Sequence, residues 1–194
     1  YYIVDFAHYY NPYPNFGAMA ADYKFFHDIG VEGVYSQGMG HSGGGGEFSL
    51  LRPYYATEFM KDQSQDPDVV MYDFFQGYYG AAAPHIYRYA KMLQQKVDTD
   101  NIHMHLYTNP GQGYLTDEIV AAGEELFNRA EEAVAGDEKL LERVRVCRMP
   151  LVYARWFPRN GYDITEGKLV FKGTLAKPDE MTAFGERMAA HGFQ

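Results

Sequence analysis

The side chains best suited to chemistry lie in the first quarter of the chain, after two segments with the pattern of buried β-strands. His8, Tyr9 and Tyr10 follow the first segment, and the stretch that begins at Gln37 and ends at Glu47 follows the second. An imidazole or an amide exchanges hydrogen bonds with hydroxyl groups, and tyrosine offers an apolar face with a polar tip. These residue types suit contacts with a sugar. A hydrogen-bonded structural role is the alternative for each of them.

Glu47 is the carboxyl group best placed for acid or base chemistry, because it follows the second strand after a glycine-dense loop. Cleavage of a glycosidic bond normally requires two carboxyl groups that flank the scissile bond. Asp5 is close to a strand end, but the alternation along the strand decides whether it faces inward. The alternative for Glu47 is an acid that stabilises the N-terminal end of a helix. We therefore name Glu47 as the catalytic candidate and expect the main catalytic carboxylates upstream of this chain.

The loop that starts at Gly38 matches the G-x-G-x-x-G pattern of dinucleotide sites, and His41 lies within it. That fingerprint also requires a following strand that ends in an acidic residue about 20 residues later. Here the pattern predicts a helix, followed by Asp66-Pro67. We interpret the loop as a lid or rim, include His41 among the candidate sugar contacts and expect no cofactor. A dinucleotide-dependent enzyme remains an alternative.

Two further signals concern metals and thiols. His103 and His105 could present two imidazoles on one face of a strand, but no third ligand is evident nearby and a closed zinc site requires four. We therefore expect no metal site. Cys147 is the one cysteine, which excludes an intrachain disulfide and predicts a buried, inert thiol.

Apolar periodicity divides the chain at about residue 62. Residues 1–62 have the pattern strand, helix, strand, helix, with strands at 2–7 and 31–36 and helices at about 17–29 and 47–61. Asn15 is placed to cap the first helix and is also a candidate sugar contact. From residue 63 onward helices dominate. They are predicted at about 66–79, 81–97, 116–136, 137–151 and 179–190, with a short strand at 169–173.

Several short stretches, taken in order, resemble a known bacterial family. The strongest is Phe74-Phe75-Gln76-Gly77-Tyr78-Tyr79-Gly80-Ala81-Ala82, and the others lie at 11–15, 28–34, 37–38, 47–54, 114–116 and 142–145. Together they resemble the domain of unknown function 4838 proteins, which are glycoside-hydrolase-like barrels, over the chain to about Arg159. One departure is that Phe59-Met60-Lys61-Asp62 stands where the family usually has Leu-Trp-Asp-Pro. This difference concerns the local loop rather than the fold.

The resemblance implies an α/β fold that leads into a mostly α region. Residues 1–62 would be the last two β/α units of a (β/α)₈ barrel of the TIM type, and residues 63–194 a helical domain. Such barrels carry their chemistry at the C-terminal ends of the strands and need roughly 250 residues. The resemblance also implies a relative of α-glucuronidase and hexosaminidase-like hydrolases. These are often exported by bacteria, so a secreted or periplasmic location follows.

The charge and composition of the chain indicate which classes of binding partner to expect. The net charge of -9 argues against nucleic acid, because an acidic surface repels phosphate backbones. No apolar run approaches the roughly 18 residues that span a bilayer. The expected substrate is a carbohydrate, and the expected reaction is acid/base cleavage of a glycosidic bond. The alternative is a non-catalytic carbohydrate-binding or scaffold module, which the 18 Tyr and 13 Phe also suit. The helical domain would shape the cleft or join copies into a homo-oligomer.

Overall fold

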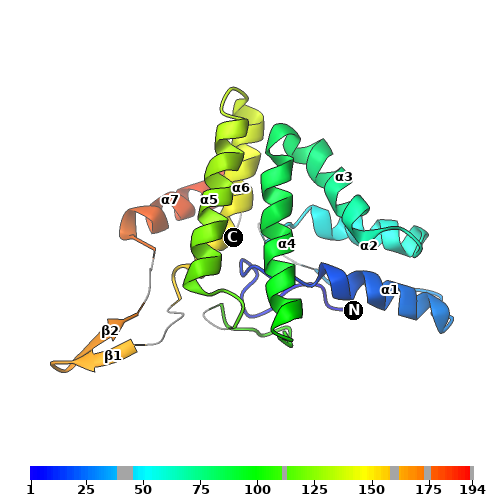
Figure 1. Ribbon diagram of the computed structural model, residues 1–194, viewed down its shortest axis with the longest axis horizontal. Coiled ribbons are helices and arrows are strands. Elements are labelled where there is room, and N and C mark those ends of the chain that lie inside the picture. The colour runs from blue at the N-terminus through cyan, green and yellow to red at the C-terminus, as the bar shows by residue number, and fades with distance from the viewer. Residues whose placement is uncertain (39–45, 111–112, 158–161, 173–175, 193–194) are drawn as a thin grey trace.

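The computed structural model describes residues 1–38, 46–110, 113–157, 162–172 and 176–192, and most of them are helical (Figure 1). A hairpin pairs β1 and β2 antiparallel, with Asp163 opposite Val170. Figure 1 shows α4, α5 and α6 side by side at the centre, α1 to α3 at one end and the hairpin at the other. The elements are α1 (Phe16–Asp28), α2 (Leu51–Lys61), α3 (Pro67–Tyr79), the 3₁₀ turn η1 (Gly80–Ala82), α4 (Ala83–Thr99), α5 (Asp117–Ala133), α6 (Glu138–Ala154), β1 (Tyr162–Thr165), β2 (Lys168–Phe171) and α7 (Pro178–Ala190).

Polar caps define the starts of three helices, as the sequence predicts. The carboxylate of Asp66 accepts a hydrogen bond from Asp68 N (2.8 Å) at the start of α3. Thr116 and Asp137 cap α5 and α6 in the same way, through the backbone N–H groups three residues later. Each cap satisfies a backbone donor that the first helical turn leaves without a partner.

The two strands predicted at 2–7 and 31–36 do not form. The two segments run in the same direction, but the ladder is reduced to one parallel bridge between Tyr2 and Gln37. Ile3 N donates to Gln37 O (3.1 Å), and Gln37 N donates to Tyr1 O (2.7 Å). Beyond the bridge, Phe6 N donates instead to Leu106 O (2.7 Å). A parallel pair is stable mainly inside a larger sheet with both faces covered. The described residues supply no such sheet, so a helix-rich fold with a parallel contact results.

The helix predicted at 47–61 begins later than expected, at Leu51. Phe48 has a φ of 50°, a left-handed conformation that a helix cannot include. Ser49 N donates to Gly46 O (3.1 Å), so residues 46–49 form a turn that leads into α2. This turn directs the side chain of Glu47 into the interior, where it is 3 % exposed as a residue.

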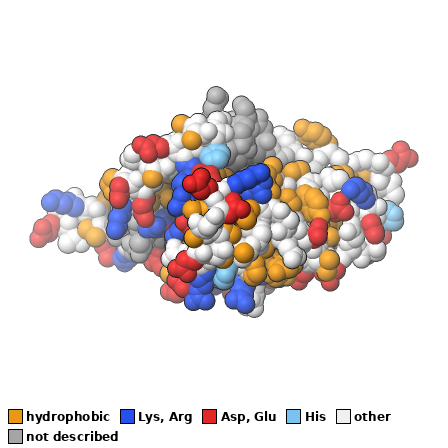
Figure 2. Space-filling view, turned by 90° about the horizontal axis from the view of Figure 1, so that it is seen from above, with side chains coloured by type: hydrophobic (Ala, Val, Ile, Leu, Met, Phe, Trp, Pro, Cys, Tyr) orange, Lys and Arg blue, Asp and Glu red, His pale blue; other side chains and the backbone are white. Residues whose placement is uncertain are grey.

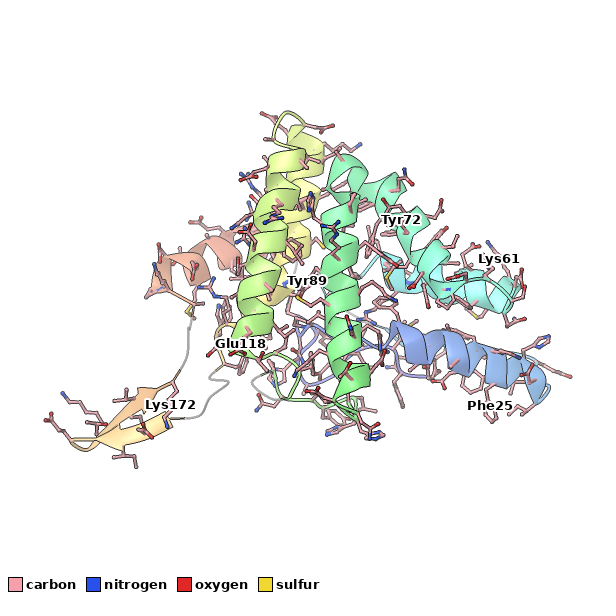
Figure 3. All side chains as sticks on the ribbon, in the orientation of Figure 1. Phe25, Lys61, Tyr72, Tyr89, Glu118 and Lys172 are labelled. Atoms are coloured by element: carbon pink, nitrogen blue, oxygen red, sulfur yellow. The ribbon has the colours of Figure 1, made fainter. Side chains whose placement is uncertain are left out.

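One hydrophobic core joins helices α1 to α6, and it includes residues from both sides of position 62. The predicted domain boundary stays a prediction. Tyr89 points from α4 into the interior, where its ring lies 4.9 Å from that of Phe127 on α5 (Figure 3). A Cβ at Gly123 would lie 3.0 Å from both Leu151 and Tyr89, so a glycine lets α5 approach α4 and α6 closely.

The surface carries charges of both signs. Acidic and basic side chains lie mixed over the face in Figure 2, with hydrophobic side chains between them. Among the helices of the described residues, none is both long and apolar enough to cross a bilayer.

Candidate functional site

Four of the predicted site residues lie in two clusters: Glu47 and Asn15 in one, and His8 and Tyr10 in the other. The arginine cluster consists of Arg52, Glu47, Asn15 and the backbone carbonyls of Ile3 and Tyr13. The aromatic cluster consists of His8, Tyr10, Tyr153, Phe157 and Phe184. A third group of polar residues is a hydrogen-bond network around Asp5, which precedes His8 in the chain.

In the arginine cluster, the buried guanidinium of Arg52 ties the first segment to the turn before α2. Nη1 donates to Ile3 O (2.9 Å) and to Asn15 Oδ1 (2.5 Å), and Nη2 donates to Tyr13 O (2.7 Å). Nε donates to Glu47 O (3.0 Å). A planar guanidinium has five N–H donors in a fixed arrangement, so it suits several carbonyls at once. Asn15 therefore bonds through its side chain to Arg52, and it makes no side-chain cap for α1.

Glu47 completes this cluster from inside the core. Its Oε2 accepts from Tyr13 N (2.7 Å) and lies 3.4 Å from Nη2 of Arg52. Its Oε1 is buried without a hydrogen bond of normal geometry from the described residues. Burial raises the pKa of Glu47 to about 7, although Arg52, the Tyr13 N–H and the Tyr89 hydroxyl all lower it. The carboxyl group is thus poised between its two protonation states near neutral pH.

A second buried carboxyl group, Asp5, organises the turn that follows the first segment. Its Oδ1 accepts from Ala7 N (3.0 Å) and His8 N (3.2 Å), and its Oδ2 accepts from Asn11 Nδ2 (3.1 Å). Burial raises the pKa of Asp5, and these hydrogen bonds partly offset that effect. The same Asn11 amide donates to Tyr114 Oη (3.1 Å), whose hydroxyl donates to Pro12 O. Asp5 therefore shapes the loop that carries His8.

The aromatic cluster brings His8 and Tyr10 against the end of α6. Nδ1 of His8 lies 2.9 Å from Tyr153 Oη, and its ring lies 5.2 Å from that of Phe157. Tyr10 contacts Tyr153 (5.8 Å) and Phe184 of α7 (5.6 Å). His8 and Tyr10 are both partly exposed. Within the described part of the chain, Nε2 of His8 has no protein partner, so it can exchange a hydrogen bond with a ligand hydroxyl.

The other predicted contacts lie apart from these clusters. Tyr9 packs edge-on against Phe6 (5.6 Å), and Gln37 forms the bridge to Tyr2 through its backbone. His41 and most of the glycine-dense loop lie outside the described residues. The chain continues from α2 directly into α3, so the strand that a dinucleotide fingerprint requires does not follow. The described residues therefore lack the second half of the dinucleotide fingerprint.

Metal ligands are not gathered in the parts of the chain that the structure describes, where no group of three or more His, Cys, Asp or Glu could hold an ion. His103 and His105 are both exposed. Cys147 is buried, as predicted, and burial raises the pKa of its thiol to about 12. A thiol in that state is a weak nucleophile at neutral pH.

Sequence reasoning missed three residues that build the site. Arg52 has only the pattern of an exposed helical arginine, and Tyr114 and Tyr153 have the pattern of core tyrosines. Tyr153 lies 145 residues from His8 in the chain, and Tyr114 lies 103 from Asn11. Local spacing carries no signal for such contacts. The several polar residues in the first 15 positions are the one sequence feature that indicates a buried hydrogen-bond network.

The fold and these clusters define a helix-rich protein with a buried Arg–Glu cluster and a partly exposed aromatic cluster. Residues 1–91 match the model of a family described as Domain of unknown function (DUF4838). The match confirms the family predicted from the sequence and ends within α4. The resemblance predicted from there to about Arg159 stays a prediction. No curated protein and no solved structure matches the chain.

Proposed function

We propose that the chain is the C-terminal part of a glycoside-hydrolase-like protein that acts on a polysaccharide or glycan. In this proposal residues 1–62 are the last two β/α units of a (β/α)₈ barrel, and the helices after them form a domain beside it. The observation that carries the proposal is the parallel bridge between Tyr2 and Gln37. Because the two segments run in one direction, the residues that follow them lie toward the same edge, where barrel enzymes hold their substrates.

Two further features support barrel units in this part of the chain. First, residues 1–91 match the same family that the sequence motifs resemble, and that resemblance implies a barrel. Tyr35 and Tyr2, which lie on the two paired segments, are 80 % and 54 % exposed. Large aromatic side chains at the margin of a two-segment pair are the surface that additional strands would cover.

In the proposed protein the aromatic cluster contacts the sugar. His8 offers Nε2 to a hydroxyl while Tyr153 holds Nδ1, and the partly exposed ring of Tyr10 offers an apolar face. Glu47 has the raised pKa that a general acid needs at neutral pH. Its side chain is 2 % exposed, so in this conformation it holds Tyr13 and Arg52 in place. We therefore assign the main catalytic carboxylates to other strands of the barrel and keep Glu47 as the candidate acid within this chain.

A non-catalytic sugar-binding or scaffold module is the second candidate. The observation that favours it is the burial of both carboxyl groups near the site, since Asp5 is 1 % exposed and Glu47 3 %. Acid/base cleavage requires two carboxyl groups that both reach the substrate. The aromatic cluster alone suffices for binding. Both candidates share the carbohydrate partner, and for both we propose export from the cytoplasm and contacts between copies through the helical domain.

The carbohydrate partner is tested by affinity electrophoresis of the native protein through gels that contain a panel of plant and bacterial polysaccharides. We expect retardation by at least one polysaccharide, and about tenfold weaker retardation in His8→Ala, because a hydrogen bond to a ligand contributes about 1 kcal/mol and packing is lost as well. His27→Ala, at a 65 % exposed position on α1, is the matched control and should behave as wild type. If no polysaccharide retards the protein, or if both variants lose retardation equally, the proposed site is wrong.

A further inference from the structure

A cavity of about 510 Å³ lies on another part of the molecule, away from the aromatic cluster. Its walls come from the turn before α2, the end of α3, the first three turns of α6 and His191, which follows α7. The apolar part of the wall includes Phe48, Leu50 and Val146. Its volume is within the range of pockets that hold small molecules.

Two cations on one face of α6 line this cavity. Lys139 and Arg143 are four residues apart, so their side chains are neighbours on the helix. Arg143 is held in a fixed orientation, because Nη1 donates to Tyr78 O (2.8 Å) and the guanidinium carbon lies 4.2 Å from the centre of the Tyr78 ring. The second cation, Lys139, makes no ion pair with any described residue. The cavity therefore offers one fixed and one unpaired positive charge.

The acidic residue of the cavity does not neutralise these cations. Glu142 accepts from Arg187 Nε (2.8 Å) and lies 3.0 Å from Nε2 of His191. Burial acts to raise the pKa of Glu142, but the hydrogen bonds from Arg187 and His191 outweigh it, so its pKa is lowered. Its charge is thus already matched by Arg187. In a chain of net charge -9, Lys139 and Arg143 leave a local excess of positive charge beside an apolar wall.

We propose that this cavity is a binding site for a small organic carboxylate with an apolar body. A planar carboxylate fits the fixed guanidinium of Arg143 and pairs with the ammonium group of Lys139. The body of the ligand packs against Phe48, Leu50 and Val146. Tyr78 positions Arg143 and is not a stacking surface for the ligand, since its ring also stacks on Phe74 (5.4 Å). The site is separate from the aromatic cluster, and its assignment does not depend on the proposed carbohydrate activity.

Binding is tested with phenylacetate and its neutral counterpart phenylacetamide, by protein-observed ¹H–¹⁵N NMR titration of the native protein. We expect saturable shifts in α6 near residues 139–147 with phenylacetate, and at least tenfold weaker binding of phenylacetamide, since a charge-assisted contact is lost. Lys139→Gln should weaken phenylacetate binding about tenfold. Lys168→Gln, a charge-matched change on the exposed hairpin, should leave the affinity unchanged.

A second variant tests the location without removing a charge. Val146→Phe places a ring in the cavity and should abolish phenylacetate binding while the far-UV circular dichroism stays that of wild type. Absence of saturable binding by phenylacetate overturns the proposal. It is equally overturned if phenylacetamide or inorganic phosphate binds as tightly as phenylacetate, or if Lys139→Gln and Lys168→Gln have the same effect.

Discussion

Replacement of Glu47 by glutamine should remove a specific part of the pH dependence of stability. Burial raises the pKa of Glu47 to about 7 from an ordinary value of 4.5, so the folded protein holds this proton more tightly than the unfolded chain does. The stabilisation is therefore complete below about pH 4.5 and is lost as the pH rises through 7. Between about pH 5 and pH 8 the change in protonation of this carboxyl group should lower the free energy of unfolding by about 2–3 kcal/mol.

Glutamine reproduces the protonated side chain at every pH. Its carbonyl oxygen can accept the hydrogen bond from Tyr13 N, and its amide can donate to the Tyr89 hydroxyl, which lies beside Glu47. We expect Glu47→Gln to be about as stable as wild type at pH 5 and about 2–3 kcal/mol more stable at pH 8. The measurement is urea unfolding at several pH values, followed by circular dichroism at 222 nm.

A matched control is Glu132→Gln, which changes an exposed glutamate on α5. Its unfolding curves should follow wild type at every pH, because surface substitutions have small effects. The contrary result would be that wild type becomes more stable than Glu47→Gln as the pH rises. That result would mean that the attraction between the Glu47 carboxylate and Arg52 exceeds the cost of burying the charge.

Two further changes test the packing and the caps. Gly123→Ala should destabilise the chain by about 1–3 kcal/mol, because its Cβ would lie 3.0 Å from Leu151 and Tyr89. In contrast, a Cβ at Gly77 in α3 would meet nothing within 4 Å, so Gly77→Ala should stabilise the chain by about 0.5–1 kcal/mol. The urea midpoints of the two variants, compared with wild type, test both expectations. Asp66→Ala should cost about 1 kcal/mol through loss of the cap on α3, and an unchanged urea midpoint would contradict the role of that cap.

The helices after residue 63 could be predicted because their signals are local. Asp66, Thr116 and Asp137 each cap a helix through contacts within three residues, and apolar periodicity marks the buried faces. The prediction of strands at 2–7 and 31–36 was wrong because a strand depends on hydrogen-bonded neighbouring strands, which its own sequence does not specify. With a single bridge between Tyr2 and Gln37, apolar content alone does not form a ladder.

The candidate site could be predicted only in part, for the same reason. His8 and Tyr10 share a cluster, but Tyr153 and Phe184, which complete it, lie far along the chain. The burial of Glu47 depends on the left-handed Phe48 that follows it, a conformation for which a non-glycine residue gives no sequence signal. Its catalytic role stays a prediction, because both Glu47 and Asp5, the two carboxyl groups described at the site, are buried.

The most direct test of the central claim is the release of new reducing ends from polysaccharides by the native protein. Each polysaccharide that retards the protein in affinity electrophoresis is incubated with it, and the reducing ends are counted over time. We expect steady release by wild type and slower release by His8→Ala, with His27→Ala unchanged. Binding without any release would contradict the hydrolase and support the sugar-binding module, and release that is identical in His8→Ala and wild type would contradict the site.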